Sequence, residues 1–403
     1  MKTHSNKNRT RACGSTLPLM MCVLVLLFTM STGLMSLGWQ SRIFAIRTGS
    51  EITARTAADA GLTKALVEMN ERLTAHVFDD IAMVEGTDED LPDCDAIYSY
   101  SADGDFKVGY TAESVGESGN AQRKVTALLR LRSLYEYALF CKEYLELKTG
   151  TVVDWYNYSP GDPTPTIGTN NIADGAVNLK MGTTVNGDIA VGVDGNPDTV
   201  INTKRNANIK GDTYALTEEQ VYSIIPPPDE LRLSKSLGTI NNETAITTSG
   251  KYDSVRMLNG KVITIEAPVT LYVVGDIILD NSSQLQIVPD NPNASLTLYI
   301  GGNIICKNGG FINNLTKDAQ KLHIYGLENC RSLDFRTEGD FYGAVYTPNA
   351  DILLHNSVDF FGAVVCTSFI QDVFAQFNYD ASLRKVDPND IGVRLVIDRW
   401  YEE

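Results

Sequence analysis

A long uncharged segment near the N-terminus constrains this chain more than any other feature. No charged side chain lies between Arg11 and Arg42, so residues 12–41 form a thirty-residue uncharged stretch centred on Leu-Met-Met-Cys-Val-Leu-Val-Leu-Leu-Phe. A helix that crosses the hydrocarbon core of a bilayer needs only about 20 such residues. It also pairs its backbone polar groups within the segment, as hydrocarbon requires. The sequence therefore predicts one membrane-spanning helix.

Basic residues in front of this stretch predict its orientation. Lys2, Lys7, Arg9 and Arg11 precede it, and the first fourteen residues contain no acidic side chain. Because segments with an excess of Lys and Arg stay in the cytoplasm, we expect a single-pass protein of the inner (cytoplasmic) membrane with a cytoplasmic N-terminus. The main body would then be periplasmic or at the cell surface.

A cleaved secretory signal is the alternative explanation of the same stretch. The stretch is longer than the roughly 7–15 apolar residues of a signal core, and no A-x-A-like site is followed by an abrupt change to globular composition. The helical pattern also continues, because no proline occurs between Pro18 and Pro92. Apolar side chains recur there at spacings of three and four, namely Leu62, Leu66, Met69, Leu73 and Val77. One helix from about residue 18 to the late seventies would be on the order of 90 Å long at ~1.5 Å per residue.

Small side chains occupy the middle of this predicted helix. Residues 53–61 read Thr-Ala-Arg-Thr-Ala-Ala-Asp-Ala-Gly, and small residues allow another helix to approach closely. An equally good interpretation is a plain helix-forming segment with Arg55 and Asp59 exposed to water.

The N-terminal region resembles that of PilX-type minor pilins over about residues 9–75. The resemblance is carried by Arg-Ala-Cys-Gly-Ser at 11–15 and by Ala-Ala-Asp-Ala-Gly-Leu at 57–62, which Ala65 and Leu66 follow. It implies a prepilin-like leader over residues 1–14 that a prepilin peptidase removes after Gly14, which leaves Ser15 as the new N-terminus. It also implies a helix over 15–78 that packs against other pilin-like subunits through Ala57, Ala60, Gly61, Leu62 and Leu66.

One residue departs from the pattern of the major pilins. Leu19 stands where major pilins carry a glutamate. The resemblance therefore implies a minor or initiating subunit rather than a major one.

A small β region is expected after the helix, over residues 79–134. An acidic segment at 79–95 contains Gly86 and Pro92 and is typical of a solvated loop. Short strand candidates follow at 97–100, 106–110 and 124–129, separated by Asp-Gly and Gly-rich turns. We expect a small antiparallel sheet packed on the helix.

A third region, over residues 135–380, shows a degenerate repeat of glycine followed by aliphatic residues. Gly275, Gly301, Gly343 and Gly362 are separated by intervals of 26, 42 and 19 residues. These intervals are close to one or two coils of a β-solenoid with about 20 residues per coil, which predicts an irregular right-handed β-helix. A two-sheet sandwich is the competing interpretation, because short evenly spaced strands suit it too.

Alternating side chains give this third region its expected core. Aliphatic residues alternate with polar neighbours and should point inward; they are Val273, Ile277, Leu279, Leu285, Ile287, Leu296, Leu298 and Ile300. The segments 154–157, 185–188, 340–351 and 359–365 resemble an uncharacterised β-helical domain often found behind PilX-like N-termini. Residues 381–403 remain as a C-terminal tail, and the fold class expected for the whole chain is α+β.

Bulk charge and cysteine pattern exclude several kinds of site. The formal net charge of −16 argues against a surface for nucleic-acid phosphates. The seven cysteines include no C-x-x-C pair, so a metal site built on them is not expected. Their apolar surroundings, as at Cys306 and Cys366, favour buried thiols over disulfides, although export would permit disulfides.

Catalytic motifs are not found in the sequence. The four histidines are scattered, and G-x-S-x-G, H-E-x-x-H and Walker A patterns do not occur. Asp103, Asp105, Asp194 and Asp198 lie in Gly-rich turns; they are better explained as turn caps than as glycosidase acids or calcium ligands. We therefore expect no enzymatic activity, no cofactor and no metal.

These observations predict a structural subunit that acts by binding. The expected function is that of a minor pilin-like or pseudopilin-like subunit of a type IV pilus or type II secretion-like filament. Its partners would be other pilin-like subunits and the inner-membrane assembly machinery. The alternative is a membrane-anchored β-helix protein that binds or cleaves polysaccharide, or an adhesin with an aromatic patch. That patch would comprise Phe360, Phe361, Phe369, Phe374 and Phe377, which core packing explains better.

Overall fold

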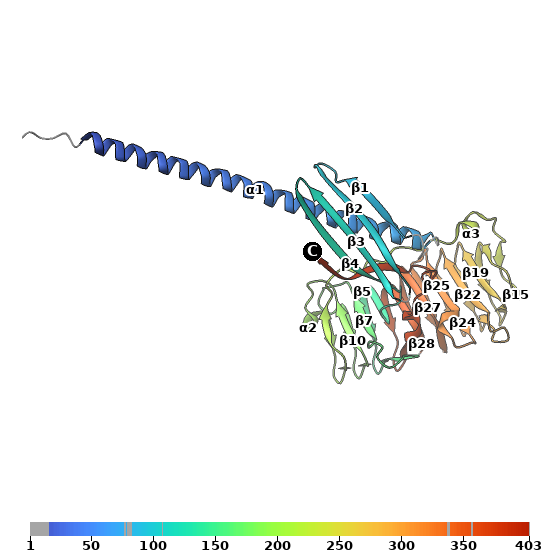
Figure 1. Cartoon of the computed structure of the whole chain (residues 1–403). Coiled ribbons are helices and arrows are strands. Elements are labelled where there is room, and N and C mark those ends of the chain that lie inside the picture. The colour runs from blue at the N-terminus through green and yellow to red at the C-terminus, as the bar shows by residue number, and fades with distance from the viewer. Residues whose placement is uncertain are drawn as a thin grey trace, which may run out of the picture. The chain divides into compact units, whose positions relative to one another are not determined.

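The chain forms two units, of which the second is inserted into the sequence of the first. The computed structural model describes residues 16–75, 78, 83–106, 108–336, 339–355 and 358–402. The first unit comprises Met1–Arg130 together with Leu395–Glu403, and the second comprises Leu131–Arg394. Both are drawn in Figure 1.

A single long helix dominates the first unit. Helix α1 runs over Thr16–Thr74, 59 residues in all, and it is drawn in blue in Figure 1. It is long and apolar enough to cross a membrane, with a mean hydropathy of 2.1 in its most apolar window and none of that window buried. The only proline in α1 is Pro18, in the first turn, where it costs no helical hydrogen bond.

A five-stranded sheet packs on the C-terminal half of α1. Its order is β1-β2-β3-β4-β30, and β1–β2 and β2–β3 and β3–β4 all pair antiparallel. The strands are β1 Glu85–Asp90, β2 Ala96–Asp105, β3 Gly109–Ser118, β4 Ala121–Arg132 and β30 Arg394–Glu402. The small antiparallel sheet expected from the sequence is therefore confirmed, although β3 begins later than the predicted strand at 106–110.

The last strand of the chain completes this sheet. The sequence predicts a C-terminal tail over 381–403, and the structure places the short helix η2 (Ala381–Arg384) and strand β30 within it. Leu395 is buried, and its backbone N–H and C=O both bond to Asn70 of α1, at 2.7 and 3.1 Å. These bonds and the burial hold the end of the chain on the helix.

The second unit is a large region of parallel strands. Its strands form a 21-stranded and a 4-stranded sheet. The first group of elements is β5 Leu139–Leu147, β6 Val152–Tyr156, β7 Thr166–Thr169, β8 Val177–Leu179, β9 Thr184–Val185, β10 Asp188–Val191, α2 Pro197–Val200, β11 Ile201–Thr203, β12 Asn208–Ile209 and β13 Thr213–Ala215. The second group is α3 Asp229–Leu233, β14 Thr239–Ile240, β15 Thr244–Ile246, β16 Gly250–Tyr252, β17 Ser254–Met257, β18 Val262–Ile265, β19 Pro268–Val273, β20 Ile277–Asp280, β21 Gln284–Ile287, β22 Ser295–Ile300, β23 Ile304–Lys307, β24 Phe311–Asn314, η1 Ala319–Lys321, β25 Leu322–Gly326, β26 Ser332–Arg336, β27 Asp340–Leu354, β28 Asp359–Gln371 and β29 Gln376–Asp380.

The two groups stack in an order that differs from the order of the chain. Parallel pairing runs through β16, β19, β22, β25, β27 and β28, and then continues into β5, β7, β10 and β13. The first group is thus added onto the end of the second, at the β28–β5 pair, and Figure 1 shows β28 in red beside β5 in green. Residues 216–228 lead from the end of β13 to α3, and residues 234–238 lead from α3 to β14.

This order explains how so large a unit can be inserted between two neighbouring strands. The chain enters the parallel region at β5 and leaves it after β29, and both lie at the junction of the two groups because β5 pairs with β28 and β28 pairs with β29. An insertion is tolerated when its two ends lie close together. Here they lead from β4 and back to β30, which are adjacent in the sheet of the first unit.

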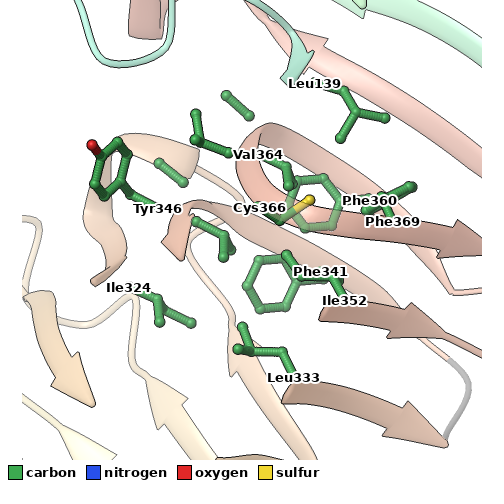
Figure 2. Close-up of a cluster of buried hydrophobic side chains, with 14 of the residues drawn as sticks. Leu139, Ile324, Leu333, Phe341, Tyr346, Ile352, Phe360, Val364, Cys366 and Phe369 are labelled. Carbon is green, nitrogen blue, oxygen red and sulfur yellow. The ribbon is translucent and has the colours of Figure 1, made fainter. Parts of the chain in front are cut away.

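The core of the parallel region consists of inward aliphatic and aromatic side chains. The aliphatic residues expected to point inward are all buried; they are Val273, Ile277, Leu279, Leu285, Ile287, Leu296, Leu298 and Ile300. Phe341, Phe360 and Phe377 stack in register, with ring centroids 4.9 and 5.1 Å apart. Figure 2 shows Phe341 and Phe360 within this buried cluster. The antiparallel pairing that a two-sheet sandwich needs is not found among the strands described in this unit.

Candidate functional site

The N-terminal half of α1 is an apolar surface that no other described part of the chain covers. Its large hydrophobic side chains are exposed on every side of the helix, with Leu24 63% and Phe28 71% accessible. The other members include Leu17, Leu19, Met20, Met21, Val23, Val25, Leu26, Leu27, Met30, Leu34, Met35, Leu37 and Trp39. Soluble monomers rarely leave contiguous apolar patches larger than a few hundred Å² exposed. An apolar surface of this extent is of the kind that lipid or another polypeptide covers.

Ion pairs mark the place where α1 meets its sheet. Arg123 of β4 pairs with Glu51 at 3.2 Å, and Arg55 pairs with Glu402 of β30 at 3.4 Å. Arg123 also lies 3.9 Å from Glu402. Because these side chains are partly exposed, each pair adds little to the free energy of unfolding. Their effect is to fix which face of the helix meets the sheet.

Small residues of α1 allow the sheet to approach closely. Ala54, Ala57, Ala58 and Ala65 are fully buried. A side chain added at Gly116 of β3 would collide with the backbone of Ala54 and Ala58. The sheet therefore lies directly on the helix backbone along this stripe.

The five residues predicted to pack between subunits divide into two classes. Ala57, Gly61 and Leu62 are buried, and a side chain added at Gly61 would lie 2.8 Å from the ring of Tyr98 in β2. Ala60 and Leu66 are only half-buried. Three of the five thus already pack within the chain, and only Ala60 and Leu66 keep surface for a second helix. Whether they contact another subunit stays a prediction.

A polar network ties the end of α1 to strands β1 and β2. Lys64 pairs with Glu89 of β1 and lies 4.0 Å from Glu68, and the hydroxyl of Tyr100 donates a 2.7 Å hydrogen bond to Glu68. Burial and the bond to Glu68 raise the pKa of Tyr100 to about 12. The hydrogen bond between Lys64 and Glu89 raises the pKa of the lysine and lowers the pKa of the glutamate. Both therefore remain charged at neutral pH.

A shallow groove adjoins the last turns of α1. It has a volume of about 480 Å³ and is lined by Leu66, Val67, Asn70, Glu71, Thr74 and Ala75. Val67 is 49% exposed. With Leu66 it supplies the apolar part of the groove lining.

The predicted leader lies outside the residues that the structure describes. Gly14 and Ser15, between which the resemblance places cleavage, precede the first described residue. Their role stays a prediction.

Aromatic side chains form a second candidate surface, on the parallel region. The ring of Tyr342 stacks on that of Phe361 at 4.4 Å, and Phe361 meets Tyr156 edge-on at 5.9 Å. A hollow of about 240 Å³ adjoins Tyr342, and its polar lining includes Asn313, Lys317, Asp340 and Gln284. Pockets that combine aromatic walls with a few polar groups are typical of small-ligand sites.

The phenylalanines proposed as an adhesin patch mostly belong to the core. Phe360, Phe369 and Phe377 are buried, whereas Phe361 is half-buried and Phe374 is exposed. A contiguous patch of all five therefore does not exist, and Phe361 contributes instead to the stack with Tyr342.

Two of the four acidic residues in the Gly-rich turns bond to their own local backbone. Asp103 accepts a hydrogen bond from the N–H of Gly104, and Asp105 accepts one from Val108, both at 2.8 Å. Asp194 adopts a left-handed backbone with φ of 60°, and Asp198 lies in the first turn of α2. Within the described part of the chain, no three His, Cys, Asp or Glu side chains come together in a metal-binding arrangement.

One charged cluster escapes sequence analysis. Asp334 of β26 accepts from Arg336 at 2.8 Å and lies 3.3 Å from His355. Arg336 follows Asp334 at the two-residue spacing of one strand face, but His355 joins them only because β26 pairs with β27. Asp334 is largely buried, and we interpret the cluster as a structural ion pair between Arg336 and Asp334 with His355 beside it.

Comparison with known proteins adds little to this geometry. A protein-family model described as a domain of unknown function (DUF7305) matches residues 229–386, which lie within the parallel region. No curated protein matches the chain. Among solved structures, the competence-associated pilin ComZ from Thermus thermophilus matches with 11% sequence identity and a TM-score of 0.23, over 88% of this chain and 98% of that chain. A TM-score this low does not establish a shared fold.

Proposed function

We propose that this chain is a pilin-like structural subunit that is held in the inner membrane by α1 and then enters a filament through the same helix. One observation carries the proposal. A continuous helix presents an apolar half with no covering, and its other half packs on a small antiparallel sheet. A spanning helix needs about 20 apolar residues, and the apolar half of α1 exceeds that length.

The resemblance of the N-terminal region to PilX-type minor pilins refines the proposal. The subunit would be a minor or initiating one in a type IV pilus or a type II secretion-like filament, because Leu19 replaces the glutamate of major pilins. Its partners would be other pilin-like subunits, the inner-membrane assembly machinery and a prepilin peptidase. It would act by binding, without catalysis, and nucleic acid would not be a partner.

The parallel region would be the part of the subunit displayed outside the membrane. We interpret its strands as the coils of a right-handed β-helix. Support comes from the parallel rows of strands, from the burial of one side of each strand and from the strong preference of parallel crossovers for the right-handed form. A β-helix presents long outer faces, which suits a module that touches something beyond the filament.

The mature N-terminus tests the proposed assembly route. The protein purified from cells with a prepilin peptidase should begin at Ser15, and the protein from cells without that enzyme should keep Met1. A Gly14→Arg variant should stay uncleaved in both, because the peptidase needs a small residue before the scissile bond. An intact Met1 in cells that contain the peptidase would contradict the proposal.

Saccharide binding is a second candidate function, favoured by the Tyr342–Phe361 stack beside a polar hollow. Aromatic rings can stack on the apolar face of a sugar ring, and amide and carboxylate groups such as Asn313 and Asp340 can form hydrogen bonds with its hydroxyls.

A glycan array tests this candidate. The full-length protein in detergent should bind members of the array. Tyr342→Ala should abolish this binding, whereas Phe374→Ala, at an exposed ring outside the hollow, should preserve it. Equal binding by both variants would remove this candidate.

A further inference from the structure

Two buried cysteines face each other at the junction of the two strand groups. Cys141 lies in β5 and Cys366 in β28, and the two residues are direct partners in the parallel register. Their sulfur atoms are 3.6 Å apart although 225 positions separate them in the sequence. Both side chains are fully buried.

The backbone geometry of this pair suits a covalent bond. Neighbouring strands lie about 4.8 Å apart, and disulfides join residues whose Cα atoms are roughly 4.4–6.8 Å apart. A change of side-chain rotamer is then enough to bring the sulfur atoms to bonding distance. Cys306 provides the contrast, because its register partners are Leu279 and Phe335, which carry no sulfur.

The pair lies close to the points where the chain enters and leaves the parallel region. Strand β5 is the first strand after the chain enters the parallel region, and β28 is the next-to-last before the chain leaves it. A link between them joins the strand where the chain enters the parallel region to a strand next to where it leaves. Figure 2 shows Cys366 of β28 in the buried cluster, and the same view contains Leu139 of β5.

We propose that Cys141 and Cys366 are oxidised to a disulfide that clamps the inserted unit at the point where the chain enters and leaves it. The inference rests on the proposed function in one respect, since export supplies an oxidising compartment. The two thiols lose two protons and two electrons. A thiol–disulfide oxidoreductase accepts them, and its own disulfide becomes a dithiol.

Burial determines when the bond can form. Burial of the Cys366 thiol, and its contact with Cys141, raise the pKa of that thiol well above its usual range. Because the thiolate is the reactive species, oxidation takes place while the unit folds, before the sulfurs are covered. The same burial then protects the finished bond from reductants in solution.

The clamp would change how the subunit responds to tension. A force applied between the two units pulls on the segments that lead into β5 and out of β29. With the bond in place, force cannot pull out the segment between the two cysteines, which are 225 positions apart in the sequence. After reduction, unfolding would release roughly 800 Å of chain at about 3.5 Å per residue.

Peptide mapping tests the bond directly. The full-length protein from the membrane fraction is alkylated under denaturing conditions without reductant and then digested. The expected result is a linked peptide pair containing Cys141 and Cys366, with Cys306 and Cys330 alkylated as free thiols. Recovery of all four as alkylated thiols would count against the bond in the cell.

A refolding experiment separates this inference from the question of export. The full-length protein is reduced, unfolded and refolded in detergent with a mixture of reduced and oxidised glutathione. A Cys141–Cys366 linkage formed here but not in cells would uphold the geometry and count against export. Failure to form it during productive refolding would overturn the inference wherever the protein resides.

Matched variants show whether the bond stabilises the unit. Reductant present during refolding should lower the thermal unfolding midpoint of the wild type by several degrees, because the bond restricts the unfolded chain. It should not affect Cys141→Ala, while Cys306→Ala should respond as the wild type does. An equal response of Cys141→Ala and the wild type would contradict the stabilising role.

Discussion

The parallel region and the N-terminal half of α1 contain the same kinds of large apolar side chain, but the first buries them and the second exposes them. Ile277 and Leu298 of the parallel region are fully buried, whereas Leu24 and Phe28 of α1 are 63% and 71% exposed. Stacked strands cover one another, since every row supplies a neighbour for the next. A lone helix that is apolar on all sides has no such neighbour within its own chain.

The difference shows which part of the molecule is complete and which part needs a partner. The parallel region buries its large apolar side chains within its own core. The exposed half of α1 is stable only in lipid or against other helices. If the chain assembles as proposed, assembly should depend on α1 and be insensitive to the core of the parallel region.

Charges in the exposed half of α1 should have the largest effect. In Leu24→Arg/Phe28→Arg, each arginine costs about 3 kcal/mol at the centre of a membrane helix. The variant should move from the membrane pellet to the soluble or aggregated fraction on alkaline extraction. Val67→Arg, at an exposed position in the other half of the helix, should stay in the pellet. Retention of both variants in the pellet would refute a membrane role for this half.

A cavity in the parallel region should reduce stability without affecting membrane retention. Phe360 is buried between Phe341 and Phe377, and Phe360→Ala should lower the free energy of unfolding by about 3–5 kcal/mol. Urea unfolding followed by circular dichroism measures the change. Phe374→Ala, at an exposed ring, should cost less than about 1 kcal/mol. Similar losses in the two variants would show that the aromatic stack is not the core.

Two glycines of α1 test where the helix is covered. Gly61 lies against Ser114 and Tyr98, whereas Gly49 has open space around it. Gly61→Leu should destabilise the first unit by about 1–3 kcal/mol through overpacking. Gly49→Leu should be neutral or add up to about 1 kcal/mol through helix propensity. Thermal unfolding in detergent distinguishes the pair, and equal effects would mean that the sheet does not pack on α1.

Acid should weaken the parallel region through one histidine. Burial lowers the pKa of His323 to about 4, so the unfolded chain, with a pKa near 6.5, takes up the proton first. The stability that His323 contributes is therefore fully present above pH 6.5 and is lost as the pH decreases from 6.5 to 4. The contribution is about 1–2 kcal/mol after allowance for partial solvent access.

His323→Phe checks this origin of the acid sensitivity. The substitution keeps a ring beside Tyr325 and removes the titration. The unfolding midpoint of the variant should fall less than that of the wild type between pH 7 and 4.5. An equal decrease of the unfolding midpoint in the two proteins would exclude His323 as the source of the acid sensitivity.

Local patterns predicted much of this architecture. The absence of charge and proline predicted α1, and the alternation of Val273, Leu285 and their equivalents predicted the buried side of each strand. Non-local pairing could not be predicted. The return of β30 to the first sheet, the β28–β5 junction and the Cys141–Cys366 pair all join residues far apart in the chain. The small residues at 54–65 show the same limit, because their spacing indicates close packing but does not say that the partner is the sheet of the same chain.

Cysteine crosslinking along α1 tests the central claim most directly. In a background with the exposed Cys22 and Cys94 replaced by serine, Leu34→Cys places a thiol on the uncovered half of the helix, and Ala57→Cys places one under the sheet. After oxidation in intact cells that assemble filaments, Leu34→Cys should give covalent complexes with neighbouring subunits, and Ala57→Cys should stay monomeric. A soluble, uncrosslinked Leu34→Cys protein that lacks the apolar segment would contradict the account.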